Sequence, residues 1–365
     1  MKLPLKAVAP TRPAATVSPA MARPLAPDTA PDAALRQIVE SCRADLLKHR
    51  AVVLGSRRPT GIHQTRVALR RLRAAFGLFR GAAELPELDR QMRALSAEAK
   101  WLAGECAPAR DLHVFLTETI EEVPPVVRRI ANRLARAHLE RARASLSGAR
   151  FAALERQLAE FAAAMPDAPA GAGLLGFGRA ILDHRHARVE HRARKIGTLH
   201  GERLHRLRIA IKKLRYAATF LAPAFADDAF AARTAKPYIE ATVRLQGALG
   251  SLNDRAVAAH VMADIAVAAR PTEDVERPLA KLAKQAASGA KRRRRRLQRA
   301  WKNFKKAERF WRDGAAVILG EVKDLSEARK RRATPVAAAA QRPFGRARRR
   351  VNARNDIGED DTDDL

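Results

Sequence analysis

Two stretches of this 365-residue chain carry the same arrangement of basic side chains. Residues 62–73 read IHQTRVALRRLR and residues 204–215 read LHRLRIAIKKLR, so both follow the pattern His-x-x-Arg-x-x-x-basic-basic-x-Arg. Guanidinium groups bind phosphate oxygens in a bidentate way, and lysine adds a point charge. The repeated pattern therefore predicts anion binding in each half of the chain. The candidate residues are His63, Arg66, Arg70, Arg71 and Arg73 in the first copy, and His205, Arg208, Lys212, Lys213 and Arg215 in the second.

The spacing within each copy favours a helix with one basic face. At about 100° per residue, the basic positions of the first copy share one side, and Leu69, Leu72 and Phe76 fall on the opposite side. No acidic residue occurs within 62–83 or 203–226. Like charges four residues apart on a helix repel each other. Because this repulsion is present in both copies, we expect an anion to offset it; an ordinary basic surface helix is the alternative.

The histidines permit more than one role. We interpret His63 and His205 as hydrogen-bond donors to phosphate, with a structural role and metal ligation as the alternatives. A metal site needs several converging ligands, and each copy supplies one histidine, so neither a metal nor a cofactor is expected. Residues 184–195 (HRHARVEHRARK) and 291–296 (KRRRRR) are interpreted as further basic lining. The secondary candidates are Arg133, Arg141, Arg185, Arg188, Arg192, Arg295 and Arg299.

The composition of the chain points to a polyanionic partner. There are 70 Lys and Arg residues against 39 Asp and Glu, which gives a formal charge of +31. Nucleic acid, an anionic membrane surface and a phosphate polymer all fit such a charge. Ala, Leu and Arg are good helix formers, and aromatic residues make up 5% of the chain, so an all-α protein is predicted. No apolar stretch approaches the length of a membrane span, and the two cysteines suit a reducing compartment, so we expect an intracellular protein without a membrane partner.

The repeat extends beyond the basic helices and divides the chain. Residues 102–111 (LAGECAPARD) and 245–254 (LQGALGSLND) match in order, and their aspartates, Asp111 and Asp254, are predicted to be structural. Each half is expected to form about four helices joined by short loops, with separate helices near 229–249 and 253–269 and one long helix near 277–311. The expected organisation is a disordered Pro/Ala-rich leader over 1–31, a folded region over 32–320 (halves about 32–165 and 178–320, hinge about 166–177), and a mostly disordered tail over 321–365.

The two basic segments, extended to IHQTRVALRRLRAAFGLF and LHRLRIAIKKLRYAATFL, resemble the CHAD domain, the conserved histidine α-helical domain. The resemblance covers roughly residues 32–320. It implies two four-helix bundles related by a pseudo-two-fold axis, with the basic helices lining a central positive cleft. It also implies binding of inorganic polyphosphate and, for some members, location on polyphosphate granules. The family's histidine and basic positions fall on the ten candidate residues of the two copies.

The function predicted from the sequence is binding of polyphosphate without catalysis, in the cytoplasm and on polyphosphate granules. A nucleic-acid binder is the first alternative. Against it, the pattern lacks the aromatic side chains on which bases stack, apart from Tyr216, and lacks the mix of Asn, Gln and Arg that reads base edges. An enzyme acting on polyphosphate, with His63 or His205 as nucleophile or base, is the second alternative. No Gly-rich phosphate loop or acidic metal-binding pair supports it, so the chain is predicted not to be an enzyme.

Overall fold

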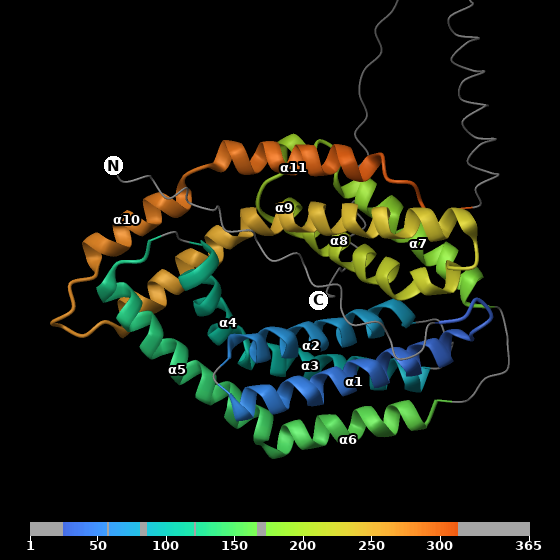
Figure 1. Cartoon of the computed structure of the whole chain (residues 1–365), viewed down its shortest axis with the longest axis horizontal. Helices are drawn as coiled ribbons and strands as arrows, with labels where there is room; N and C mark the ends of the chain where they lie inside the picture. The colour runs from blue at the N-terminus through green and yellow to red at the C-terminus, as the bar shows by residue number, and fades with distance from the viewer. Residues whose placement is uncertain (1–24, 57, 81–85, 120–121, 166–172, 313–365) are drawn as a thin grey trace, which may run out of the picture. The chain divides into compact units, whose positions relative to one another are not determined.

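The computed structural model describes residues 25–56, 58–80, 86–119, 122–165 and 173–312, and within these ranges it contains helices and no strands (Figure 1). The prediction of an all-α protein is confirmed. The elements are α1 (Pro31–Gly55), α2 (Pro59–Phe79), α3 (Pro86–Glu105), α4 (Ala107–Val114), the π-helical turn η1 (Phe115–Thr119), α5 (Pro125–Ser147), α6 (Ala149–Ala163), α7 (Leu174–Arg192), the 3₁₀ turn η2 (Ile196–Thr198), α8 (Gly201–Leu221), the 3₁₀ turn η3 (Ala222–Phe225), α9 (Ala229–Ala268), α10 (Glu276–Ala287) and α11 (Ala290–Lys305).

The first half of the chain packs four long helices together. Helix α1 lies against α2 and α6, and α3 lies against both α2 and α6. The apolar side of α1 is buried through Ile38 and Leu46, and that of α2 through Leu69, Leu72 and Phe76, as the helical spacing predicts. Pro59 stands in the first turn of α2, where a proline costs no hydrogen bond. This packing leaves the basic side of α2 facing away from the first-half core.

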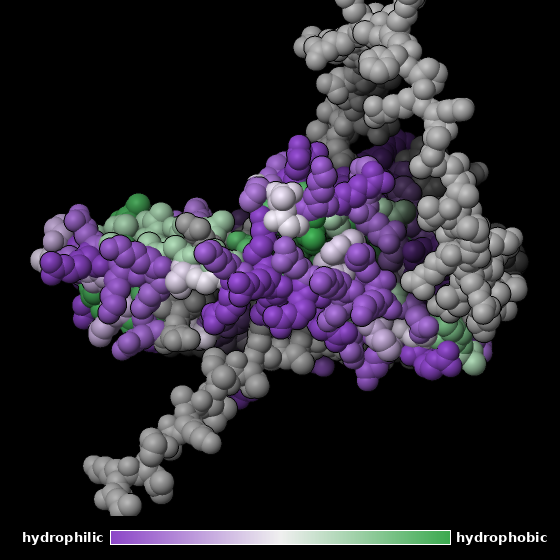
Figure 2. Space-filling model, turned by 90° about the horizontal axis from the view of Figure 1, so that it is seen from above, coloured by the Kyte–Doolittle hydropathy of each residue, from purple (hydrophilic) through white to green (hydrophobic). Residues whose placement is uncertain are grey.

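The second half packs α7 against α8, α8 against α9, and α9 against α11. Seen from the α11 side, the surface of the protein is largely hydrophilic (Figure 2). Helix α8 also packs against α2, and one hydrophobic core runs through both halves. A second, smaller core joins α4 and the start of α5 to the end of α9 and α10. The pseudo-two-fold relation between two separate bundles stays a prediction.

Three expectations from the sequence are wrong. Residues 229–268 form one helix, α9, where a break was expected near residue 250. The long helix expected over 277–311 is interrupted at Gly289, whose φ of 74° is left-handed and ends α10 before α11 begins. The leader ends earlier than residue 31, because Leu25 is 1% exposed in the main core. The carbonyl of Thr29 also accepts a hydrogen bond from the amide of Leu174 at 3.0 Å, which fixes the approach to α1.

The remaining predictions about organisation fall largely outside the described residues. These are the leader over 1–24, most of the hinge (166–172) and the chain after residue 312, which includes the tail. Within the described residues, no helix has both the length and the apolar composition that crossing a bilayer requires.

Candidate functional site

The basic faces of α2 and α8 meet. Lys212 on α8 has a pKa lowered to about 8, first by burial and then by the positive charges of Arg208, Arg70, Arg73 and Lys213. Two of these neighbours, Arg70 and Arg73, belong to α2. The charge of Arg70 also acts on Arg215, whose pKa is lowered mainly by burial. Side chains from both copies of the pattern therefore share one region, which we call the cationic seam: Arg70, Arg73, Arg208, Lys212 and Arg215.

Two equivalent arginines of the seam have unsatisfied donors. Arg73 and Arg215 occupy the last position of the pattern in their respective copies. The Nε atom of each is buried and has no hydrogen-bond partner among the described residues. Burial lowers the pKa of both guanidinium groups. A buried donor without an acceptor costs about 1–3 kcal/mol, so each Nε is available to an acceptor from outside the chain, whether water or a ligand.

Arg185 links α2 and α8 through hydrogen bonds to the backbone of both helices. It comes from α7, is 9% exposed, and donates from Nη1 to the carbonyl of Lys213 and from Nη2 to the carbonyl of Gly77, both at 2.8 Å. Burial lowers its pKa to about 10. The sequence placed Arg185 in the basic lining, and this is corrected: its donors are used by backbone carbonyls of α8 and α2.

Arg71 lies on the core side of α2. It is 4% exposed, its Nη1 donates to Asp45 Oδ2 at 2.6 Å, and its guanidinium lies 6.0 Å from the centre of the Phe220 ring. The prediction that all five basic residues of the first copy share an accessible face is therefore wrong at Arg71. The physical reason is its angular position, about 80° from His63, which is the flank of the helix that turns toward α1.

His63 stands at the end of the seam nearest α4. Its pKa is lowered to about 4 by burial first and then by Arg110 and Arg70, so its imidazole is neutral at pH 7. A neutral imidazole can donate one hydrogen bond, as the sequence interpretation requires. Its counterpart His205 is also half-buried, on α8.

Arg66 is partly engaged within the protein. Its Nη1 donates to the carbonyl of Ala103 at 2.5 Å, and Asp111 on α4 is the negative charge with the largest effect on its pKa, which burial lowers. Burial raises the pKa of Asp111, and Arg66 and Arg110 oppose that effect. The interaction of Asp111 with Arg66 supports the structural role predicted for Asp111. The side chain of Asp254 is not among those that the structure describes.

Arg110 is a residue that the sequence reasoning missed. It lies on α4, its charge is the largest electrostatic influence on His63, and its Nη2 donates to Glu118 at 2.9 Å. Arg110 could have been identified as a candidate from the sequence, because it directly precedes Asp111 in the repeated segment 102–111.

The other secondary candidates are spread over the protein. Arg192 donates to the carbonyl of Arg206 at 3.1 Å, which ties α7 to α8. Arg188 and Arg141 are exposed on α7 and α5, and Arg295 and Arg299 are exposed on α11, whose main packing partner is α9. Among the described residues, Arg141, Arg295 and Arg299 form no hydrogen bond or ion pair with a seam residue.

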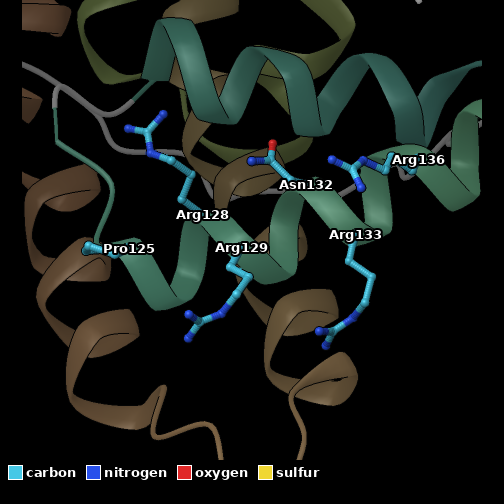
Figure 3. A pocket seen from close by; sticks show the side chains of 6 residues that line it. All are labelled: Pro125, Arg128, Arg129, Asn132, Arg133 and Arg136. Atoms are coloured by element: carbon cyan, nitrogen blue, oxygen red, sulfur yellow. The ribbon is translucent and has the colours of Figure 1, made fainter.

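Arg133 belongs to a separate arginine-rich hollow of about 590 Å³ along α5 (Figure 3). Its Nη2 donates to the carbonyl of Ala268 at 2.8 Å and to Glu273 Oε2 at 3.2 Å. Arg128 and Asn132 point to one side of α5, whereas Arg129 and Arg133 point to the other, where Glu273 pairs with both. The hollow is therefore partly neutralised, and its arginines diverge.

Among the described residues, no three His, Cys, Asp or Glu side chains are grouped closely enough to hold a metal ion.

The fold and the paired basic helices can be compared with known proteins. Residues 37–263 match the family described as "CHAD domain", and this chain belongs to that family. The crystal structure of the CHAD domain from the plant Ricinus communis is similar, with a TM-score of 0.66, 24% identity, and coverage of 79% of this chain and 96% of that chain. PptA from Streptomyces chartreusis is a more distant match, with a TM-score of 0.46, 17% identity, and coverage of 78% and 99%. No curated protein matches the chain.

Proposed function

We propose that this CHAD-family chain binds inorganic polyphosphate in the cationic seam and does not transform it. The observation that carries the proposal is the pair of equivalent arginines, Arg73 and Arg215, each with a buried Nε that lacks an acceptor. A chain of phosphate groups supplies acceptors at short, regular intervals, so one ligand can satisfy donors from both α2 and α8. The convergence of Arg70 and Arg73 on Lys212 supports a single shared ligand.

Polyphosphate suits the seam better than nucleic acid does. Single-stranded nucleic acid is held by stacking of bases on accessible aromatic rings. Tyr216, the aromatic residue beside the basic pattern of α8, is 5% exposed and lies within 6.0 Å of Phe220 between ring centres. Its ring is therefore used inside the protein, and the seam offers cations without a stacking surface.

The character of the donors supports binding without turnover. Guanidinium groups stay protonated at neutral pH, so they hold phosphate oxygens but do not exchange protons with them. His63, at the end of the seam, is neutral at pH 7 because burial and the charges of Arg110 and Arg70 lower its pKa to about 4. From the same proposal we expect a location on cytoplasmic polyphosphate granules, because a protein that binds the polymer is retained where the polymer collects.

The test is a titration with long-chain polyphosphate of the wild type and of an Arg73→Gln/Arg215→Gln variant. We expect the affinity to fall about tenfold for each arginine removed, because a hydrogen bond to a charged group contributes about 1.5–3 kcal/mol. The matched control is Arg156→Gln/Arg244→Gln, which removes the same charge from exposed arginines that pair with Glu160 and Glu240. Equal affinity in the two variants would overturn the assignment of the site.

Two further measurements complete the test. In competition, polyphosphate should displace DNA and RNA at a far lower phosphate-equivalent concentration, and the reverse order would favour the nucleic-acid alternative. Incubation with polyphosphate and divalent metal ions should release no orthophosphate. Release that disappears in a His63→Ala or His205→Ala variant would establish an enzyme instead.

A further inference from the structure

The charged residues of helix α11 are all basic. It contains nine basic residues and no acidic one. Two of its five consecutive arginines have structural contacts. Arg293 donates to the carbonyl of Ala286 at 3.2 Å, and Arg294 donates to the carbonyl of Leu199 at 2.7 Å. The remaining cations must be explained separately.

Five cations of α11 form a row on its outer side. They are exposed, and at about 100° per residue they fall within an arc of about 120°, over a length of about 15 Å. The apolar residues Leu297 and Phe304 are fully buried on the opposite side, against α9. We call this row the α11 ridge: Arg292, Arg295, Arg296, Arg299 and Lys302. In Figure 2 the α11 side faces the viewer, and the surface over it is strongly hydrophilic.

The α11 ridge has no counter-charge within the described part of the chain. None of its five residues forms a hydrogen bond or an ion pair with another described residue. Helix α6, the last helix of the first half, provides an internal comparison. Its exposed charges are mixed, with Arg150 paired to Glu98 at 2.7 Å and Arg156 to Glu160 at 3.7 Å. A one-signed row at spacings of three and four residues repels itself, so an external anion is expected to offset the repulsion.

The ridge is separate from the cationic seam. Helix α11 packs mainly against α9, and in Figure 1 it lies on the far side of α8 and α9 from α2. We propose that the α11 ridge is a second binding surface for polyphosphate, so that one protein molecule holds two chains, or two segments of one chain, at once. This inference rests on the proposed function of the seam, because a polymer held there raises the effective concentration of phosphate at every other cationic surface of the protein.

The two surfaces differ in kind. The seam is half-buried and draws on two helices, whereas the ridge is a single exposed row on a convex surface. Exposed contacts to a polyanion depend on counterion release and are weakened by salt. The ridge therefore adds a second binding site more than it adds affinity. A protein with one site coats a polymer, whereas a protein with two sites cross-links polymer chains.

The experiment compares three variants. The ridge variant is Arg292→Gln/Arg295→Gln/Arg299→Gln, in which glutamine retains helix propensity. The seam variant is Arg73→Gln/Arg215→Gln. The matched control is Arg90→Gln/Arg156→Gln/Arg244→Gln, which removes three exposed arginines that pair with Glu87, Glu160 and Glu240. Circular dichroism checks the helix content of each.

Two readouts are measured at low salt. Calorimetry with a short oligophosphate gives the stoichiometry, expected to be two for the wild type and the control and one for the ridge and seam variants. Light scattering with long-chain polyphosphate reports cross-linking. We expect the ridge variant to lose the scattering that the wild type and the control show at the same concentrations, because a protein with one site cannot cross-link two polymer chains.

The outcomes separate the two proposals. If the ridge variant keeps wild-type stoichiometry and scattering while the seam variant loses binding, the second surface is refuted and the seam stands. If the ridge variant loses all binding and the seam variant loses none, the proposed function of the seam fails. Parallel titrations use duplex DNA and vesicles containing phosphatidylglycerol. Loss of binding to either of these in the ridge variant, with unchanged polyphosphate scattering, would overturn the assignment of the ridge to polyphosphate.

Discussion

Arg70 and Lys212 occupy the same position in the two copies of the basic pattern, and the charge of Arg70 on α2 lowers the pKa of Lys212 on α8. Residues at equivalent positions meet in this way when two helices are related by a two-fold axis that passes between them. The like charges of the two side chains repel each other, and burial adds to the cost of the ionised form of Lys212. A polyanion that binds between them removes both penalties.

The first prediction is a pH dependence of binding. The pKa of Lys212 is about 8 in the free protein, below its usual value of 10.5, and a bound polyanion favours the charged form and raises it. Binding therefore takes up a proton above pH 8. We expect the affinity to be highest below pH 8 and to fall by up to about tenfold per pH unit above it, which is the limit for one proton.

The variant Lys212→Arg isolates this effect. Arginine stays protonated over the whole range, so the affinity of the variant should change little between pH 7 and pH 9. Titrations in buffers with different ionisation enthalpies measure the proton uptake directly. A wild-type affinity that is flat across that range, with no proton uptake, would show that Lys212 does not contact the ligand.

The second prediction separates stability from binding at adjacent residues. Asp45→Asn leaves the buried guanidinium of Arg71 without its carboxylate partner. Removing one partner of a buried ion pair costs about 3–5 kcal/mol. Because Asp45 is partly exposed, the free energy of unfolding measured with urea should fall by about 3 kcal/mol, the lower end of that range.

The contrasting variant is Arg70→Gln. Arg70 is exposed and lies in the repulsive field of Lys212, so its removal should leave the stability unchanged or slightly raised while polyphosphate affinity falls. If Arg70→Gln destabilised the fold as much as Asp45→Asn does, the division between a binding residue and a core residue would be wrong.

The helical fold and the region of the site could be predicted from the sequence because both depend on local periodicity. Leu69, Leu72 and Phe76 recur at helical spacing, and burial follows from that spacing alone. The duplication of the pattern identified both helices of the seam, α2 and α8. That the two faces turn toward each other depends on packing between distant segments, which no local pattern encodes.

The errors at individual residues have the same origin. Arg71 carries the same charge as Arg70, and only the position of Asp45 on α1 distinguishes the buried residue from the exposed one. Arg185 was expected to meet an anion, but the carbonyls of Gly77 and Lys213 take its donors. Arg295 and Arg299 of the ridge were predicted to line the same site as the seam residues. The sequence shows that these residues are charged but not on which face of the protein they lie.

The third prediction concerns the break between α10 and α11. Gly289 has a φ of 74°, a conformation that costs other residues about 1 kcal/mol. A Cβ atom at this position would meet atoms of Arg292 and Arg293 no closer than 3.5 Å, so the space is sufficient and the backbone alone sets the penalty. Gly289→Ala should therefore lower the free energy of unfolding by about 1 kcal/mol, and Gly289→Asn by less, because asparagine tolerates the left-handed region. Equal stability of all three proteins in urea would contradict this.

The fourth prediction is a loss of stability in mild acid that originates at His186 on α7. This histidine is 3% exposed, its Nδ1 lies 2.8 Å from the hydroxyl of Tyr238, and its ring lies 5.2 Å from that of Phe304 between centres. Burial first, and then Arg309, lowers its pKa to about 4, while Glu190 and Asp183 act in the opposite direction.

The sign of the effect follows from proton binding. Between pH 6.5 and about 4 the unfolded chain carries a proton at this position and the folded chain does not, so acidification through that range favours unfolding. His63 contributes in the same direction, because its pKa is also about 4. We expect the melting temperature to fall steadily from pH 6.5 to pH 4. A His186→Asn variant should be less stable at pH 7, but its melting temperature should fall less on acidification. A variant that shows the full wild-type slope would place the acid-sensitive group elsewhere in the protein.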